Sequence, residues 1–332
     1  MQHEDWLKSV VRDEADAVSA GLAEQPRWLN QFVPLGEDDG GSAGTGAEAE
    51  EPALLRGGVM VAAGSSAPKT GGWGGTGLMV LPLHVAAAAG ALGVMRVLVE
   101  AGGAVECRTR HGSGLYGRET PMHLAASAGH AAVVAWLLGQ KAGAAVLDAD
   151  SAWPMHRAAA GGHAAVVGVL LGDAADDEPG TAQKAAPSAG LEEGNAGRGV
   201  RVGDVGLEAR DGQGRTPLHV AIRGGFQGKG DSSGGPPTLD ERGLRGVIAV
   251  VERLTAGGAE VDATCPKEAD AFTALHRCVS QGEAWLPVAE GLVKAGADVT
   301  LRDPRHERTA GELAGMLGLV GYEALLGTRP AG

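Results

Sequence analysis

A four-residue pattern that returns along the chain limits its possible folds more than any other feature. The pattern reads Thr-Pro-Leu-His or a close variant, and each copy leads into small residues and then, usually, a glycine. The copies are LPLH from Leu81, TPMH from Thr120, WPMH from Trp153, TPLH from Thr216 and TALH from Thr273, with a degenerate TAGELA from Thr309. Such repetition predicts one small structural unit used several times, because each copy has to bury its apolar face against the next.

Each copy predicts a pair of helices. In the copy that begins at Thr120, the threonine hydroxyl can cap the first helix, and the proline that follows suits the first helical position, where no N–H is needed. Paired alanines keep this first helix thin. An apolar stripe after the turn glycine, as in AVVAWLLG from Ala132, predicts the second helix, and a Gly-Ala or Gly-Gly pair is a signal for its end.

This combination resembles the ankyrin repeat, over Gly77 to Gly327 apart from two inserts. The family period of about 33 residues matches the interval from Thr120 to Trp153. The resemblance implies an all-α fold with short β-hairpin fingers, an ankyrin-repeat solenoid of helix-turn-helix units. About five repeats are expected, with the copy at Thr309 as the C-terminal cap.

Two of the intervals are longer and carry inserts. Residues at about 173–205 and 226–245 have few bulky apolar residues, so we expect them to be disordered within the repeat domain of residues 77–327. Long loops are compatible with a solenoid because each doubling of loop length costs only about 0.6 kcal/mol. Residues 36–76 are rich in glycine and alanine and are expected to form a disordered linker.

The N-terminal segment, residues 1–35, has a helical pattern with Trp6, Leu7 and Val10 on one face. It can cap the stack, dock a partner as a separate helix, or form a degenerate extra repeat.

The net charge and the cysteine content limit the possible partners and the cellular compartment. The net charge of −13 gives no long-range attraction for nucleic acid or anionic lipid. Cys107, Cys265 and Cys278 have no CxxC spacing, which favours a reducing compartment, the cytoplasm or the nucleus. No apolar run approaches the roughly 20 residues of a membrane span.

The sequence predicts no enzyme, cofactor or metal site. No GxxxxGK(S/T) or HExxH motif is present, and the GxGxxG letters at Gly72 to Gly77 lie in a Gly-rich linker with no predicted strand before them. The repeat motif places one histidine in each of five copies: His84, His123, His156, His219 and His276. A metal needs ligands about 2 Å away, whereas stacked helices lie roughly 8–10 Å apart. The resemblance implies a structural, hydrogen-bonding role for these histidines.

The resemblance also implies that the fingers and the inner face of the first helices bind a partner protein. The finger from Val105 to Glu119 is longer than the family's, and its composition is cationic. It carries Arg108, Arg110, His111, Tyr116 and Arg118. Arginine and tyrosine are enriched in binding hot spots, so we expect this finger to dock an acidic segment. The alternative is a loop that is simply solvated.

On the inner face, four further residues are candidates for partner binding. Arg157 and Arg277 directly follow a motif histidine, and Arg223 and Gln281 precede a turn glycine or lie beside one. The alternative for Arg157 and Arg277 is that their aliphatic stems cover apolar neighbours. We expect a monomeric scaffold, adaptor or inhibitor. The alternatives are a regulatory subunit of an enzyme or channel complex, with catalysis supplied in trans, and nucleic-acid binding through the finger, which the overall acidity opposes.

Overall fold

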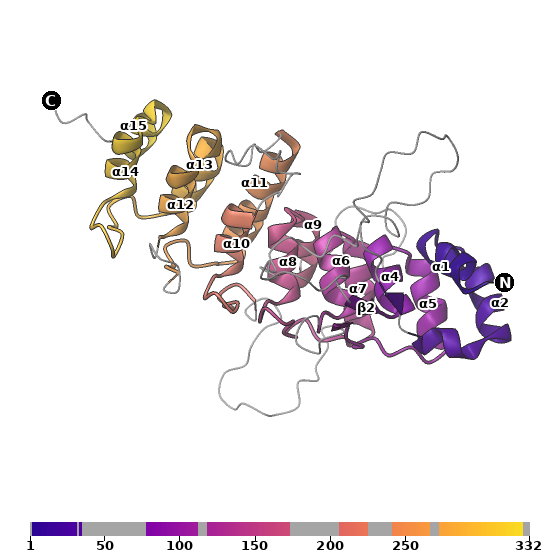
Figure 1. Ribbon diagram of the computed structural model, residues 1–332. Helices are drawn as coiled ribbons and strands as arrows, with labels where there is room; N and C mark the ends of the chain where they lie inside the picture. The colour runs from indigo at the N-terminus through magenta and orange to yellow at the C-terminus, as the bar shows by residue number, and fades with distance from the viewer. Residues whose placement is uncertain are drawn as a thin grey trace, which may run out of the picture. The chain divides into compact units, whose positions relative to one another are not determined.

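The computed structural model describes residues 2–31, 33–34, 78–111, 118–172, 206–224, 241–265 and 272–327 (Figure 1). The described residues form two compact units, unit 1 within residues 1–149 and unit 2 within residues 150–332. The expected linker and the first insert lie outside the described residues.

Unit 1 stacks helices in pairs. Its helices are α1 (His3–Val11), α2 (Ala15–Glu24), the short 3-10 helix η1 (Pro26–Asn30), α4 (Pro82–Ala89), α5 (Leu92–Glu100), α6 (Pro121–Ala128) and α7 (Ala131–Gly139). The first helices follow one another, α1 against α4 and α4 against α6, and α2 lies against α5. Each pair therefore buries one face against the next, as in a solenoid.

A small antiparallel sheet accompanies the pairs of unit 1. It contains β1 (Val33–Pro34), β2 (Leu78–Val80) and β3 (Arg110–His111) in that order. Val33 lies opposite Val80, and Met79 lies opposite Arg110. These short strands join the segment before α4 to the finger before α6.

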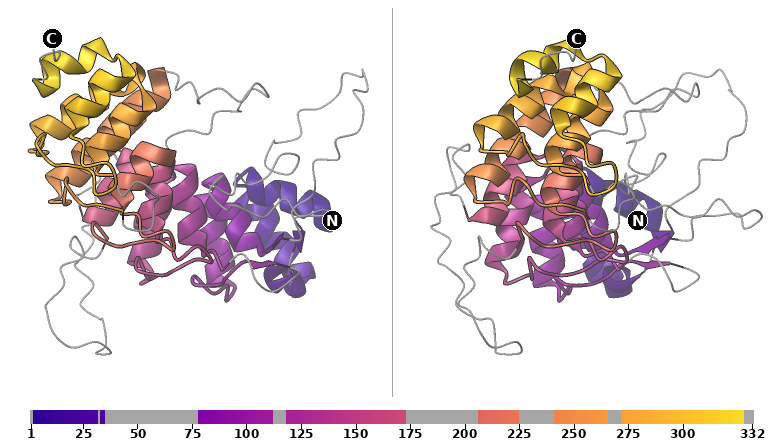
Figure 2. Two further views of the ribbon diagram at one scale, coloured as in Figure 1. Left: turned by 60° about the vertical axis from the view of Figure 1, so that its left-hand side comes forward. Right: turned by 90° about the vertical axis from the view of Figure 1, so that its left-hand side faces the viewer.

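Unit 2 continues the same construction within itself. Its helices are α8 (Pro154–Ala160), α9 (Ala164–Leu171), α10 (Pro217–Gly224), α11 (Glu241–Ala256), α12 (Ala274–Gln281), the 3-10 helix η2 (Glu283–Trp285), α13 (Leu286–Lys294), α14 (Ala310–Leu317) and α15 (Val320–Leu326). The first helices α8, α10, α12 and α14 contact one another in order, and so do the second helices (Figures 1 and 2).

The helix starts confirm the predicted repeats. From α4 to α14, every first helix begins one residue after the motif start, at proline in four copies and at Ala274 and Ala310 in the other two. The turn glycine can leave the right-handed region, as at Gly129, whose φ is 85°. The all-α solenoid prediction is therefore confirmed.

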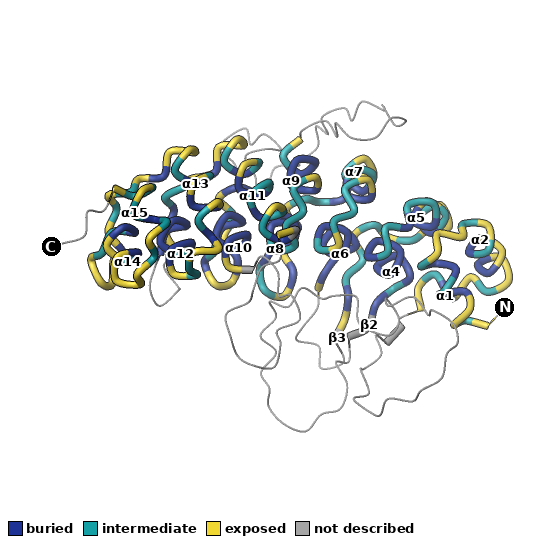
Figure 3. The backbone as a smooth tube through the Cα atoms, turned by 90° about the horizontal axis from the view of Figure 1, so that it is seen from above, coloured by how far each residue is buried: buried dark blue, intermediate teal, exposed yellow. Residues whose placement is uncertain are grey.

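Small aliphatic side chains fill the core. The paired alanines of the first helices are fully buried at Ala86, Ala87, Ala125 and Ala126, which lets neighbouring helices approach closely. Val and Leu of the second helices complete the packing, and Leu98 and Leu254 have no exposed surface. Figure 3 shows the burial concentrated on the sides of the helices that face other helices.

The second predicted insert is shorter at its C-terminal end than expected. Helix α11 begins at Glu241, so residues 241–245 are helical rather than disordered. A Glu241–Arg245 ion pair of 2.9 Å spans one helical turn there, and Val247 begins the buried stripe that anchors the helix. The preceding part of that insert lies outside the described residues.

The N-terminal helices pack as a further pair. Trp6 is fully buried and its Nε1 donates to the Val18 carbonyl over 3.1 Å. Asp13 Oδ1 accepts from the Val94 N–H over 2.7 Å at the start of α5. Because α1 and α2 lie against α4 and α5, we propose that this pair of helices caps the stack of unit 1.

Candidate functional site

The motif histidine is the third residue of its helix, and its ring closes the start of that helix. The Thr120 N–H donates to His123 Nδ1 over 3.2 Å, and Thr120 Oγ1 lies 2.9 Å from the same nitrogen. The Leu81 N–H donates to His84 Nδ1 over 3.1 Å. The imidazole thus replaces the glutamate of a capping box, and Nδ1 is the unprotonated nitrogen because it accepts a hydrogen bond.

At His84, His156 and His276 the other ring nitrogen ties the helix to the finger that follows it. His84 Nε2 lies 3.2 Å from the carbonyl oxygens of Cys107 and Glu119 and donates to them. The same contact joins His156 to the carbonyls of Ala209 and Arg215, and His276 to that of Arg308. The imidazoles therefore link one repeat to the next.

Burial keeps these rings neutral. It lowers the pKa of His84 to about 4 and that of His219 to about 4, against the opposing effect of nearby backbone carbonyls. Cys107 Sγ lies 3.8 Å from the His84 ring, but burial raises the pKa of this thiol to about 12. Both groups are uncharged at neutral pH, so they do not form the thiolate–imidazolium pair of a cysteine nucleophile.

The part of the chain that the structure describes holds no group of three or more His, Cys, Asp or Glu side chains placed to bind a metal. Backbone groups already occupy the ring nitrogens of His84 and His156, one at the start of the same helix and the other in the finger that follows.

The cationic finger, Val105–Glu119, is closed by backbone pairing. The Thr109 N–H donates to the Glu119 carbonyl over 2.9 Å, and the Arg118 N–H donates to the Thr109 carbonyl over 3.2 Å. Arg110 and Arg118 are exposed. The His111 side chain and all of Tyr116 lie outside the described residues. The finger therefore presents at least two of its predicted basic side chains to solvent.

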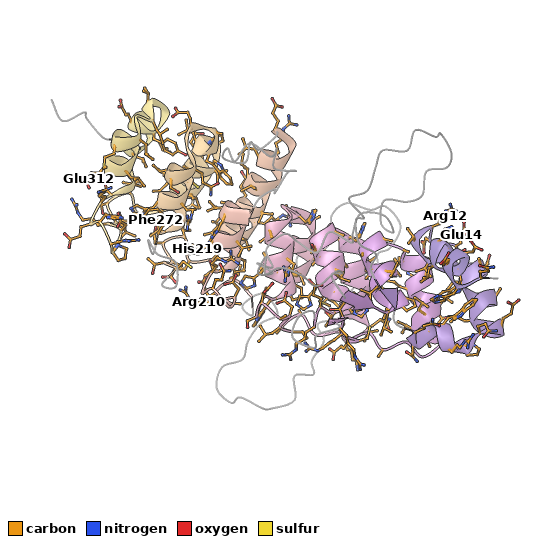
Figure 4. The ribbon with its side chains drawn as sticks, viewed as in Figure 1. Arg12, Glu14, Arg210, His219, Phe272 and Glu312 are labelled. Carbon is orange, nitrogen blue, oxygen red and sulfur yellow. The ribbon has the colours of Figure 1, made fainter. Side chains whose placement is uncertain are left out.

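Arg108 differs from its neighbours because it stabilises the finger. Its Nη1 donates to the Arg118 carbonyl over 3.3 Å and to the Leu147 carbonyl over 2.9 Å. In unit 2, Arg210 makes the same pair of bonds, to the carbonyls of Gly214 and Thr264, each over 2.8 Å (Figure 4 labels Arg210). Arg108 was predicted as a partner contact, and the structure gives it an internal role, joining one finger to the next.

A carboxylate on one finger also accepts from the backbone of the next one, a feature that the sequence analysis missed. Glu106 Oε1 accepts from the Gly143 N–H over 2.8 Å in unit 1. In unit 2, Glu208 accepts from the Glu260 N–H over 2.7 Å, and Asp262 accepts from the Asp298 N–H over 3.1 Å. The acidic residue at this place in the AGGAVE and AGGAEVD segments was the available signal.

The inner-face candidates divide by exposure. Arg157 is only 7% exposed and its Nη2 lies 3.0 Å from Asp150 Oδ2, so the prediction that it is a docking group on the surface is wrong. Gln281 Nε2 donates to the Ile222 carbonyl over 2.8 Å, which directs its amide inward. Arg277 is half-buried with its guanidinium 5.6 Å from the centre of the Phe272 ring, and Arg223 is exposed. Phe272 lies near the start of α12 (Figure 4).

Sequence reasoning also missed an apolar surface at the last turn. Met316, Leu317 and Val320 are exposed around the α14–α15 turn. The signal was present, because Met316 and Leu317 are the two residues before the turn glycine of the last copy.

Comparison with known protein families supports the assignment of the repeats. The model of a family described as ankyrin repeats (3 copies) matches residues 83–179. No curated protein matches the chain. Within the described residues, no helix combines the length and the apolar character that crossing a membrane requires.

Proposed function

The chain is an ankyrin-repeat protein, and from this we propose that it is a scaffold, adaptor or inhibitor that binds a partner protein. Ankyrin repeats are generally protein–protein interaction modules. The family is typically non-catalytic, and we extend that property to this chain. Two motif histidines support this extension, since burial lowers the pKa of His84 and of His219 to about 4 and leaves neither as a general base with a pKa near neutrality.

The choice of the finger as the binding surface rests on one observation. Arg110 and Arg118 are exposed on one finger of a chain whose net charge is −13. A local cluster of cations on an acidic protein selects an acidic partner segment at short range, where it outweighs the long-range repulsion.

The test compares two variants of the full chain as affinity baits. Arg110→Ala with Arg118→Asn removes the two exposed charges, and asparagine tolerates the positive φ of 58° at residue 118. Arg12→Ala with Arg96→Ala removes the same charge from exposed positions elsewhere in unit 1. Arg108 is left in place because it holds the finger together.

Partners that the finger binds should be captured by the wild-type chain and by the Arg12/Arg96 variant, and lost from the Arg110/Arg118 variant. Binding of a purified partner, measured by calorimetry, should weaken at least tenfold in the finger variant alone. Equal affinity of all three proteins for every purified partner would refute the role of the finger.

A further inference from the structure

Exposed apolar side chains gather at one place in unit 2. Four large apolar side chains are exposed in the described part of the chain, and three of them surround the α14–α15 turn. Met316 is 65% exposed, Leu317 52% and Val320 72%. Figure 3 colours most of the backbone along this turn as exposed. Contiguous exposed apolar residues on a folded protein mark an interaction site or an unfinished interface.

The fold does not require large apolar residues at these positions. Counted from the motif start, Met316, Leu317 and Val320 occupy the places of Ser127, Ala128 and Ala131 in the repeat that starts at Thr120. Both copies make the same turn, with Gly129 at a φ of 85° and Gly318 at a φ of 69°. Small residues therefore suffice to build this turn.

Basic side chains lie on the helices next in the row. Helix α12 contacts α14, and α10 contacts α12. Helix α10 carries the exposed Arg223 in its last turn, and α12 carries the half-buried Arg277. Burial lowers the pKa of Arg277, and the charge of Arg223 lowers it further. The apolar patch thus has a cationic neighbour on the same unit.

We propose that Arg223, Arg277, Met316, Leu317 and Val320 form one docking row for an extended segment of a partner protein, in which an acidic residue is followed or preceded by a bulky aliphatic one. This inference rests on the proposed function and specifies a second surface for it. The aliphatic side chain packs on Met316, Leu317 and Val320, and the carboxylate faces the two arginines.

The spacing of the helices sets the spacing of the partner's residues. Packed helices lie about 8–10 Å apart, so α10 and α14, which are separated by α12, lie about 16–20 Å apart. An extended chain advances about 3.3 Å per residue. A carboxylate at Arg223 therefore lies about five or six residues from the aliphatic anchor, and a carboxylate at Arg277 about three.

The charges favour such a segment over a second copy of this chain. A symmetric contact through this surface would bring the row against itself, with its arginines on both sides and a net charge of −13 on each copy. An acidic, aliphatic segment is complementary to both ends of the row.

The experiment uses the full chain and a phage library of random twelve-residue peptides. The patch variant, Met316→Ser with Leu317→Ala and Val320→Ala, installs the residues that the chain itself carries in its second motif copy. Leu147→Ala removes the remaining exposed large apolar side chain and is the apolar control. Arg223→Gln tests the charge, with the exposed Lys294→Gln as its control. Circular dichroism and thermal unfolding check that each variant is folded.

Selection on the wild-type chain should enrich peptides with an Asp or Glu three to six residues from a Leu, Ile, Met or Phe. An enriched peptide should bind the patch variant at least tenfold more weakly and Arg223→Gln severalfold more weakly, and the two controls should match the wild type. Replacing the peptide's acid by its amide should remove most of the effect of Arg223→Gln.

Three results would overturn the docking row. They are enrichment of no peptide, enrichment of peptides that bind the patch variant unchanged, and a wild-type dimer in sedimentation that the patch variant abolishes. Peptides that bind the patch variant with unchanged affinity but do not bind the Arg110/Arg118 variant would contradict this inference and still support the proposed function. Failure of the finger test alone would leave the docking row intact.

Discussion

The motif histidine shows how one side chain can serve two levels of structure. Its Nδ1 accepts from the backbone at the start of its own helix, and its Nε2 donates to the finger of the next repeat, as at His84. The Nδ1 contact needs the neutral ring, because protonation of Nδ1 would remove its acceptor lone pair. In the last copy Glu312 takes over the capping role and accepts from the Thr309 N–H over 3.0 Å. The Nε2 contact has no counterpart there.

These neutral rings predict a loss of stability in acid. The folded pKa of His84 and of His219 is about 4, below the unfolded value of 6.5. The unfolded chain therefore binds more protons between these values, so stability is complete above about pH 6.5 and falls as the pH drops toward 4. By pH 4 each ring should cost about 3 kcal/mol. Urea unfolding from pH 7 to pH 4 measures this.

The control for that prediction is His84→Gln, which should be less stable at pH 7 but lose less stability on acidification. An unchanged pH slope in this variant would show that His84 titrates normally in the folded protein.

The last finger contains a backbone position that a glycine would suit better. Glu307 has a φ of 54° and lies two residues before the helix cap Thr309, in the place where the finger at Thr216 has Gly214, with a φ of 80°. Residues with a Cβ pay about 1–2 kcal/mol in this conformation, partly offset by the entropy of a flexible glycine.

Glu307→Gly should therefore raise the free energy of unfolding by about 0.5–1 kcal/mol, measured by urea denaturation. Glu307→Ala is the matched control, because it removes the carboxylate and keeps the Cβ. If the alanine variant gains as much as the glycine variant, the charge and not the backbone strain is responsible.

At the scale of elements, the fingers are joined to one another by side chains that bond to backbone. A carboxylate such as Glu208 accepts from the next finger, and an arginine such as Arg210 donates to carbonyls of its own finger and of the next. These bonds fix the spacing of fingers that have very little strand structure of their own. In unit 2 the described finger stems show single bridges, Thr264 with Thr273 and Arg302 with Thr309.

Glu208→Ala should lower the free energy of unfolding by about 1 kcal/mol, because the Glu260 N–H loses a charged acceptor but remains open to water. Glu290→Ala, on the exposed surface of α13, is the control and should change stability little. Chemical denaturation of both variants measures these changes in the free energy of unfolding. Equal stability of the two would mean that the link between fingers contributes nothing.

At the scale of the whole molecule, each unit is held together by contacts between neighbouring helices. Helix α11 contacts α9, α10 and α13, and each first helix of unit 2 contacts its own second helix and the neighbouring first helices. Stability in such an arrangement is close to a sum over repeats and their interfaces.

This predicts that a destabilising substitution in the core affects mainly its own helix and the neighbouring ones. Leu254 of α11 is fully buried, and Leu254→Ala should cost about 2–5 kcal/mol through the cavity that it leaves. Hydrogen exchange followed by mass spectrometry should show the largest loss of protection in α9 to α13, and a smaller one in α14 and α15. Leu98→Ala in α5 is the companion variant for unit 1. Uniform loss of protection across all of unit 2 would contradict the nearest-neighbour picture.

The amino-acid sequence by itself determined the repeat and the starts of the first helices. These are local properties, since the cap, the proline and the histidine that define a start lie within four consecutive residues. Thr120 and His123 meet because they are three residues apart at the beginning of a helix, whatever lies around them. The period then forces stacking, because one helix pair alone cannot bury its apolar faces.

Only the tertiary structure decided which charged and apolar side chains remain available to a partner. Arg108 bonds to Leu147 and Arg157 to Asp150, and no sequence pattern distinguishes them from the exposed Arg110 and Arg223. The place of Met316 and Leu317 before a turn glycine is visible in the sequence, but that no described helix covers them is not. Exposure depends on what packs against a residue from elsewhere in the chain, and that is fixed only when the repeats stack.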